Sequence, residues 1–138
     1  MSHNYPMTDY KALEATLTQY FAEVLNLAID EEIFRGGIPS GVEHGVGVIF
    51  KGEVRDGTLN PRVTVQVLGK FDTRDEALEV LTKLSDCAPR YGVDNDGYSY
   101  GLSAILPTSG VGSPYLASDR GKVKHFISCN YLVLYKEK

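Results

Sequence analysis

Apolar residues recur at steps of three and four near the start of the chain, which is the spacing of one face of an α-helix. This pattern predicts a helix over residues 9–27, and Thr8 is a residue type that caps helix N-termini. Polar residues occupy the opposite face, so the helix should pack its apolar side against a sheet. The predicted buried residues are Tyr10, Leu13, Leu17, Tyr20, Phe21, Val24 and Leu25, and the predicted solvated ones are Lys11, Glu14, Thr18, Gln19 and Glu23.

Alternating apolar and polar residues then predict three strands before the next helix. A short first strand begins at Ile33 and ends in a turn that contains glycine and proline. Residues 46–54 and 62–71 flank a turn-forming cluster that includes Asp56 and Asn60, and this order predicts an antiparallel hairpin. The inward face of its second strand should carry Val63, Val65 and Val67.

A second helix is predicted directly after this hairpin. Thr73 followed by Glu76 is the capping-box pattern of a helix N-terminus, in which each residue can satisfy a backbone N–H of the other. The helix should run to about Asp86 with an apolar stripe against the sheet. The residues of this stripe are Ala77, Leu78, Leu81 and Leu84.

The second half of the chain predicts two further strands. Residues 91–97 are rich in turn formers, 98–106 form a strand with Gly101 at a bulge, and 122–135 form the last strand. Residues 107–121 between them are predicted to be a long loop. The element order α-β-β-β-α-β-β predicts an α+β fold with two helices on a mainly antiparallel sheet, and residues 1–138 form a single domain.

Composition and charge argue against two classes of function, nucleic-acid binding and membrane insertion. The 138 residues carry a formal charge of −4, and no run of Lys or Arg exceeds two residues, which disfavours a nucleic-acid-binding surface. The apolar stretches are far shorter than the roughly 20 residues that span a bilayer, and no signal-peptide pattern opens the sequence. We therefore expect a cytoplasmic protein with no membrane partner, in which Cys87 and Cys129 are reduced and structural.

Residues that could bind a metal are scattered. His3, His44 and His125 fall in different predicted elements, and none has a second ligand at metal-binding spacing. Residues 94–97 resemble part of a calcium loop, but Ser103 stands where the twelfth-position glutamate should be. The same residues also fit a tight turn built from Asp, Asn and Gly. The sequence therefore predicts no metal site and no cofactor site.

Candidate catalytic residues are equally sparse. His125 and Cys129 would share one face of a strand at a separation of more than about 12 Å, too far for a catalytic dyad. Phosphate-binding glycine loops and nucleophile-elbow strings are absent from the sequence. The nine tyrosines could line either an interface or the core. Those of the second half are Tyr91, Tyr98, Tyr100, Tyr115, Tyr131 and Tyr135.

Three strings carry a resemblance to a known family. They are IFRGGIP at 33–39, VTVQV at 63–67, and YLASDRG at 115–121, the last leading into FISCNY at 126–131. Together with the element order, they resemble the phage minor capsid and tail terminator (tail completion) proteins of long-tailed phages. The resemblance covers nearly the whole chain, and its motifs are structural turns and strand patterns without reactive groups.

This resemblance implies a subunit that forms a ring, usually of six copies, which caps the tail tube and joins it to the head. The implied partners are further copies of the chain, the tail tube and head-completion proteins. The implied location is the virion, and the cytoplasm of the bacterial host during assembly. Such proteins are not enzymes and hold neither a cofactor nor a small-molecule substrate.

The size and charge of the chain are compatible with such a ring. A domain of this length has a radius of gyration of about 14 Å, so six touching copies would leave a hole wide enough for duplex DNA. A lumen that shared the negative charge of the chain would repel the phosphate backbone. DNA should therefore pass through without specific binding.

Two glycine-rich loops, 36–47 and 107–121, are the predicted contact surfaces. Neither has enough apolar side chains to pack alone, so we expect both to be mobile in the monomer and to become ordered against neighbouring subunits or the tail. The hairpin turn between the second and third strands is a further candidate. The predicted contact residues are Gly110, Val111, Tyr115, Leu116, Asp56 and Asn60.

Two other functions fit the same sequence. One is a small cytoplasmic α+β enzyme or ligand-binding domain with its pocket between the sheet and the first helix. The other is an adaptor that binds a single partner by strand addition at an exposed edge. An assembly subunit should form a ring, whereas an enzyme should have a defined pocket with titratable residues of perturbed pKa.

Overall fold

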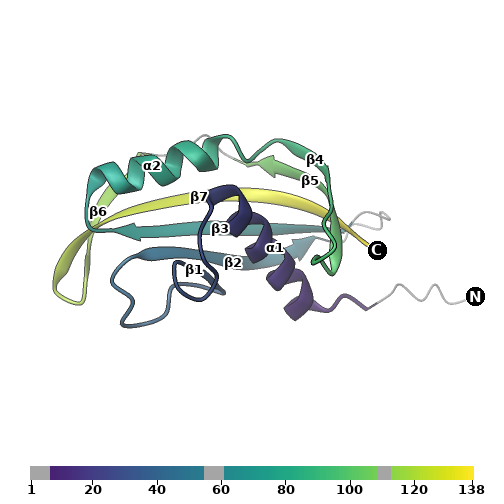
Figure 1. Cartoon of the computed structure of the whole chain (residues 1–138), viewed down its shortest axis with the longest axis horizontal. Coiled ribbons are helices and arrows are strands. Elements are labelled where there is room, and N and C mark those ends of the chain that lie inside the picture. Colours follow the sequence, from purple (N-terminus) through teal and green to yellow (C-terminus); the bar gives the residue numbers. More distant parts are fainter. Residues whose placement is uncertain (1–6, 55–60, 109–112) are drawn as a thin grey trace, which may run out of the picture.

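A computed structural model describes residues 7–54, 61–108 and 113–138. One sheet of seven strands carries both helices against the same face (Figure 1). The elements are α1 (Tyr10–Leu25), β1 (Ile33–Arg35), β2 (Gly45–Val54), β3 (Arg62–Phe71), α2 (Arg74–Ser85), β4 (Arg90–Val93), β5 (Tyr100–Pro107), β6 (Tyr115–Asp119) and β7 (Lys122–Glu137). This is the α+β fold that the sequence predicts.

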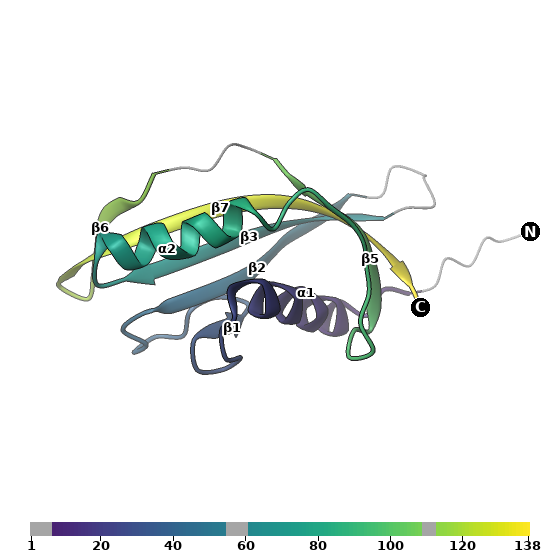
Figure 2. The same cartoon turned by 45° about the horizontal axis from the view of Figure 1, so that its top comes forward.

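The long strand β7 runs through the middle of the sheet and pairs with three other strands, β3, β5 and β6 (Figure 2). The strand order is β1-β2-β3-β7-β5-β4, and β6 also pairs with β7. β6 lies beside the first residues of β7 and β5 beside its last ones, so both share the edge of β7 that faces away from β3. Among the strands of the described residues, β1 and β2 alone pair in parallel, which confirms the mainly antiparallel sheet.

The core lies between the two helices and the face of the sheet beneath them. The β2–β3 hairpin has the predicted bounds to within one residue, and the three inward valines of β3 are fully buried. Alternate residues of β7 are buried on the same face, because successive side chains of a strand point to opposite sides. The buried residues of β7 on this face are Ile127, Cys129, Tyr131, Val133 and Tyr135.

Helix α1 differs from its prediction at the cap, at its C-terminal end and at three positions, one of which is Val24, expected to be buried but only partly so. Asp9, and not Thr8, is the N-cap, since its side chain accepts a hydrogen bond from the backbone N–H of Ala12. Tyr10 was expected in the core but is 46% exposed, because it lies at the first turn with its ring against Phe50 of β2. Thr18 was expected in solvent but is buried.

Burial of Thr18 is possible because its hydroxyl donates to the Glu14 carbonyl oxygen at 2.8 Å within the helix. A polar group that is satisfied by its own helix can be buried without the cost of an unpaired donor. Leu13, Leu17, Tyr20, Phe21 and Leu25 are buried as predicted. The helix ends at Leu25, two residues early, because Asn26 adopts a left-handed conformation.

Helix α2 begins at the predicted N-cap, Thr73, with one of the two backbone bonds of the capping box and a hydroxyl-to-carboxylate bond in place of the other. Thr73 Oγ1 accepts from the Glu76 backbone N–H at 3.2 Å and donates to Glu76 Oε1 at 2.9 Å. Ala77, Leu81 and Leu84 are buried against the sheet, while Leu78 is only partly covered.

Two strands, β4 and β6, occupy segments that the sequence predicts as turn or loop. β4 replaces part of the turn-rich segment 91–97, and β6 lies within the predicted loop 107–121, whose first residue also ends β5. Both are edge strands with largely exposed side chains, so they lack the alternating burial pattern by which a strand is recognised. The bulge of β5 lies between Leu102 and Ala104, not at Gly101.

The glycine-rich segment 36–47 is also shorter than predicted, because its last three residues begin β2. Gly47 requires the absence of a side chain. A Cβ there would stand 2.9 Å from the Cα of Gly37 and 2.9 Å from the backbone N of Ile38. The turn after β1 therefore packs its backbone directly on β2.

Candidate interaction surface

The β6–β7 hairpin projects from one end of the sheet (Figure 1). β7 pairs His125 with Phe71, the last residue of β3, so the residues before His125 extend past the end of β3. Arg120 and Gly121 form the turn, both with positive φ. The tip of the hairpin therefore has strand neighbours only within itself.

Two buried lysines tie this hairpin to the end of β3. Lys70 of β3 is 6% exposed and its ammonium donates to Asp119 Oδ2 at 2.7 Å. Lys124 of β7 is 3% exposed and donates to Asp72 and, at 3.2 Å, to Glu43 Oε2. Each buried ammonium has a carboxylate partner, which is the condition under which a charge is tolerated out of water.

The ion pairs have the expected effects on protonation. The hydrogen bond from Lys124 lowers the pKa of both Asp72 and Glu43, and the hydrogen bond from Lys70 lowers the pKa of Asp119. The hydrogen bond to Asp72 raises the pKa of Lys124. All of these groups are therefore held in their charged forms at neutral pH.

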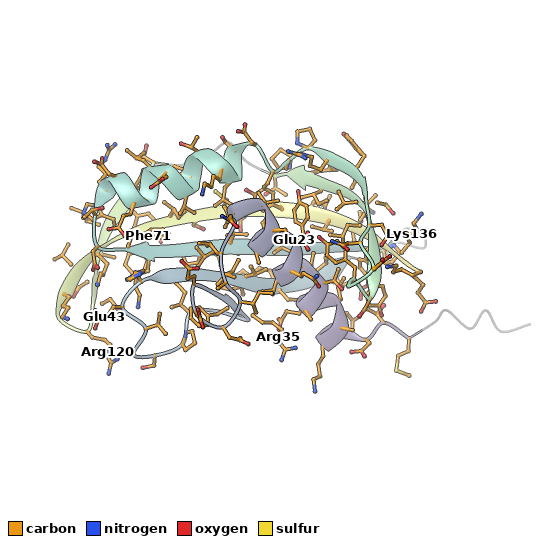
Figure 3. The ribbon with its side chains drawn as sticks, in the orientation of Figure 1. Glu23, Arg35, Glu43, Phe71, Arg120 and Lys136 are labelled. Atoms are coloured by element: carbon orange, nitrogen blue, oxygen red, sulfur yellow. The ribbon has the colours of Figure 1, made fainter. Side chains whose placement is uncertain are left out.

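The loop between β1 and β2 packs beside the hairpin tip, as Glu43 and Arg120 show in Figure 3. Glu43 Oε2 also lies 3.5 Å from Lys122 Nζ, and His44 Nδ1 lies 4.0 Å from Asp72 Oδ2. A Cβ on Gly41 would stand 3.6 Å from the Arg120 guanidinium. These contacts make the hairpin, the loop and the end of β3 one connected unit.

The hairpin nevertheless leaves large apolar side chains in solvent. Leu116 is 62% exposed and Val123 is 65% exposed. Leu116 pairs with His125 and Ser118 pairs with Val123, so the two apolar side chains lie on the same face of the hairpin. We call Leu116 and Val123 the hairpin patch. Tyr115 on the other face is 46% exposed and stacks on Phe126 at 5.7 Å.

A second surface feature is a groove of about 260 Å³ between α2 and the C-terminal end of α1. We call it the helix groove. Its apolar lining includes Leu25, Val46, Phe71 and Val80. Three carboxylates, of Glu32, Glu76 and Glu79, also line it, against the single lysine Lys83. The Lys83 ammonium donates to the Leu25 carbonyl oxygen at 3.4 Å and thereby interacts with the C-terminal end of α1.

The predicted contact residues are only partly placed. Tyr115 and Leu116 lie on β6 and are exposed, in agreement with their proposed accessibility. Gly110, Val111, Asp56 and Asn60 lie outside the described residues. The structure thus brings two of the six candidates into one hairpin, and adds Val123, which the sequence prediction missed.

Most of the described tyrosines are buried in the core. Tyr98, Tyr100, Tyr131 and Tyr135 are buried, whereas Tyr91 and Tyr115 are exposed. The buried hydroxyls have partners. Tyr131 donates to the Leu84 carbonyl at 3.1 Å, and Tyr20 donates to the Cys87 carbonyl at 2.5 Å. Burial raises the pKa of Tyr20 to about 12, so its hydroxyl stays a donor at neutral pH.

The segment 94–97 is a tight turn held by the end of the chain. Lys138 Nζ lies 2.9 Å from Asp94 Oδ1 and donates to the carbonyl oxygens of Asn95, at 2.7 Å, and Tyr98, at 3.1 Å. An ammonium group therefore occupies the position in which a calcium loop would hold its ion. Within residues 7–54, 61–108 and 113–138 there is no group of three His, Cys, Asp or Glu that could hold a metal.

The chain shares its fold with a component of a known virion. A protein chain in the structure of the virion of a native gene transfer agent particle superimposes with a TM-score of 0.50 over 92% of this chain and 97% of that one. The two sequences are 13% identical, so the similarity is one of fold. No family model and no curated protein matches the sequence.

The ion-pair cluster had no signal in the sequence. Lys70 and Lys124 stand where outward-facing polar residues of a strand are expected, and lysine is normally exposed. Their partners Glu43, Asp72 and Asp119 are distant in the chain and meet only through the sheet register.

Among the described helices, none is long and apolar enough to cross a membrane.

Proposed function

We propose that this chain is a structural subunit of a phage or phage-like virion that forms a ring at the head-proximal end of the tail and joins the tail to the head. Its partners are further copies of itself, the tail tube and head-completion proteins, and DNA passes through the ring without specific binding. It acts in the virion and assembles in the host cytoplasm. The fold shared with a gene transfer agent virion chain supports this role.

The observation that carries the proposal is the stiff hairpin with its uncovered patch. A two-stranded hairpin alone is marginally stable, but here the ion pairs of two buried lysines tie it to the end of β3. A pre-organised projection loses little conformational entropy when a partner covers it. Burial of an aliphatic side chain stabilises an interface by about 1.5–3 kcal/mol, so Leu116 and Val123 can contribute to subunit contact.

The cluster of charged side chains at this end also fits a role without catalysis. Its described lysines and carboxylates pair with one another and thereby hold a loop and a hairpin in place. The pKa shifts there keep each group in its usual charged form. A general acid or base needs the opposite effect, a pKa moved toward neutrality.

Sedimentation velocity of the purified protein tests the proposal. Wild type should sediment as a ring, and a Leu116→Asp/Val123→Asp variant should sediment as a monomer that still melts cooperatively. Tyr91→Asp is the control, since it places a negative charge on another exposed position of an edge strand. Wild type that stays monomeric at every concentration would contradict the proposal.

A further inference from the structure

We propose that the hairpin patch of one copy inserts into the helix groove of the next copy, an inference that rests on the proposed ring. The occupant of the groove is thus a second copy of this chain. The hairpin patch is a projection and the helix groove is a depression. Both have apolar side chains at the centre, and the charged side chains around them are of opposite sign.

The polar part of the match is electrostatic. The groove has three carboxylates around its lining and one lysine, whose ammonium contacts a backbone carbonyl. The hairpin tip carries two exposed cations on either side of the turn glycine, Arg120 and Lys122, of which Lys122 also lies 3.5 Å from Glu43 of its own chain. Opposite charges at the rim of an interface orient the partners and exclude wrong registers.

The apolar part of the match lies beneath these charges. Leu25, Val46 and Phe71 line the floor of the groove with little exposed surface of their own, and Val80 is partly buried at its side. The volume suits one or two aliphatic side chains, and Leu116 and Val123 are two such side chains on one face of the hairpin. An apolar centre with a charged rim is the usual anatomy of a protein interface.

The positions of the two surfaces predict how copies assemble. The hairpin projects from the end of the sheet (Figure 1), whereas the groove is lined by residues of both helices and the sheet beneath them. A contact between two different surfaces is head-to-tail, and repeated head-to-tail contacts form a ring when the rotation from one copy to the next closes. A contact of either surface with itself would instead stop at a dimer.

Mixing two one-sided variants tests this contact. The hairpin variant, Leu116→Asp/Val123→Asp, keeps an intact groove, and the groove variant, Glu79→Lys/Val80→Arg, keeps an intact hairpin. Each alone should be monomeric, and the equimolar mixture should form a one-to-one heterodimer, because only one competent contact remains. Melting curves of both variants serve as folding controls.

The outcomes separate this inference from the proposed function. A groove variant that still forms rings overturns the inference and leaves the ring intact as a proposal. Two monomeric variants whose mixture stays monomeric also overturn it. Wild type that never assembles overturns the proposed function itself.

A cysteine pair gives a second measurement that does not depend on loss of assembly. Val123→Cys/Val80→Cys in one chain should form disulfides between copies under oxidation, giving a ladder of covalent oligomers on a denaturing gel. Each single cysteine variant should run as a monomer on the same gel, because the native Cys87 and Cys129 are buried. Equal cross-linking of singles and double, or none in the double, would overturn the inference.

Discussion

Replacement of Leu17 by alanine measures how much the packing of α1 on the sheet contributes to the free energy of unfolding. Leu17 has no exposed surface and belongs to the same buried cluster as the β3 valines and the β7 tyrosines. The substitution removes buried methyl groups and leaves a cavity that helix and sheet can only partly close. Leucine-to-alanine changes at such sites destabilise by about 2–5 kcal/mol.

The loss can be expressed as a melting temperature. The entropy of unfolding of about 2.1 cal/mol/K per residue gives roughly 0.3 kcal/mol/K for this chain, so the melting temperature should fall by about 7–17 °C. Lys11→Ala on the exposed face of α1 is the matched control and should change it little. Urea titrations at a fixed protein concentration provide the free energies. A loss below about 0.5 kcal/mol for Leu17→Ala would refute the assigned helix face.

Other predictions follow from single features. Gly47→Ala should destabilise by about 1–3 kcal/mol in urea titrations, because its Cβ meets backbone, whereas Gly97→Ala meets only the flexible Gln19 amide and should be nearly neutral. The hydrogen bond from Lys70 lowers the pKa of Asp119, so the ionised Asp119 contributes to the free energy of unfolding. This contribution is full above about pH 4 and is lost as the pH falls further. Asp119→Asn should therefore lower the melting temperature at pH 7 and flatten its fall below pH 4. A steeper fall would contradict the pairing.

The elements with a burial pattern were predictable from the sequence. The capping box at Thr73, the hairpin of β2 and β3 and the buried stripe of α1 all follow from local spacing, which is set by the period of the helix or strand. β4 and β6 were missed for the converse reason. Edge strands are stabilised by backbone pairing with β5 and β7 and bury few side chains, so their sequences carry little periodicity.

The candidate surface was predictable only in part. Tyr115 and Leu116 were identified because apolar residues in a glycine- and proline-rich segment suggest a partner. Val123 was placed only within the last predicted strand and not among the contact residues, since the sequence does not show that β7 extends past β3 before His125. The buried Lys70 and Lys124 depend on register between distant segments, which no local pattern encodes.

Electron microscopy of the purified wild-type protein shows whether the chain assembles into a ring. We expect closed rings of identical subunits around a hole wide enough for duplex DNA, and loss of these rings in the Leu116→Asp/Val123→Asp variant. Monomers, or two-fold dimers that do not assemble further, would contradict the proposed ring.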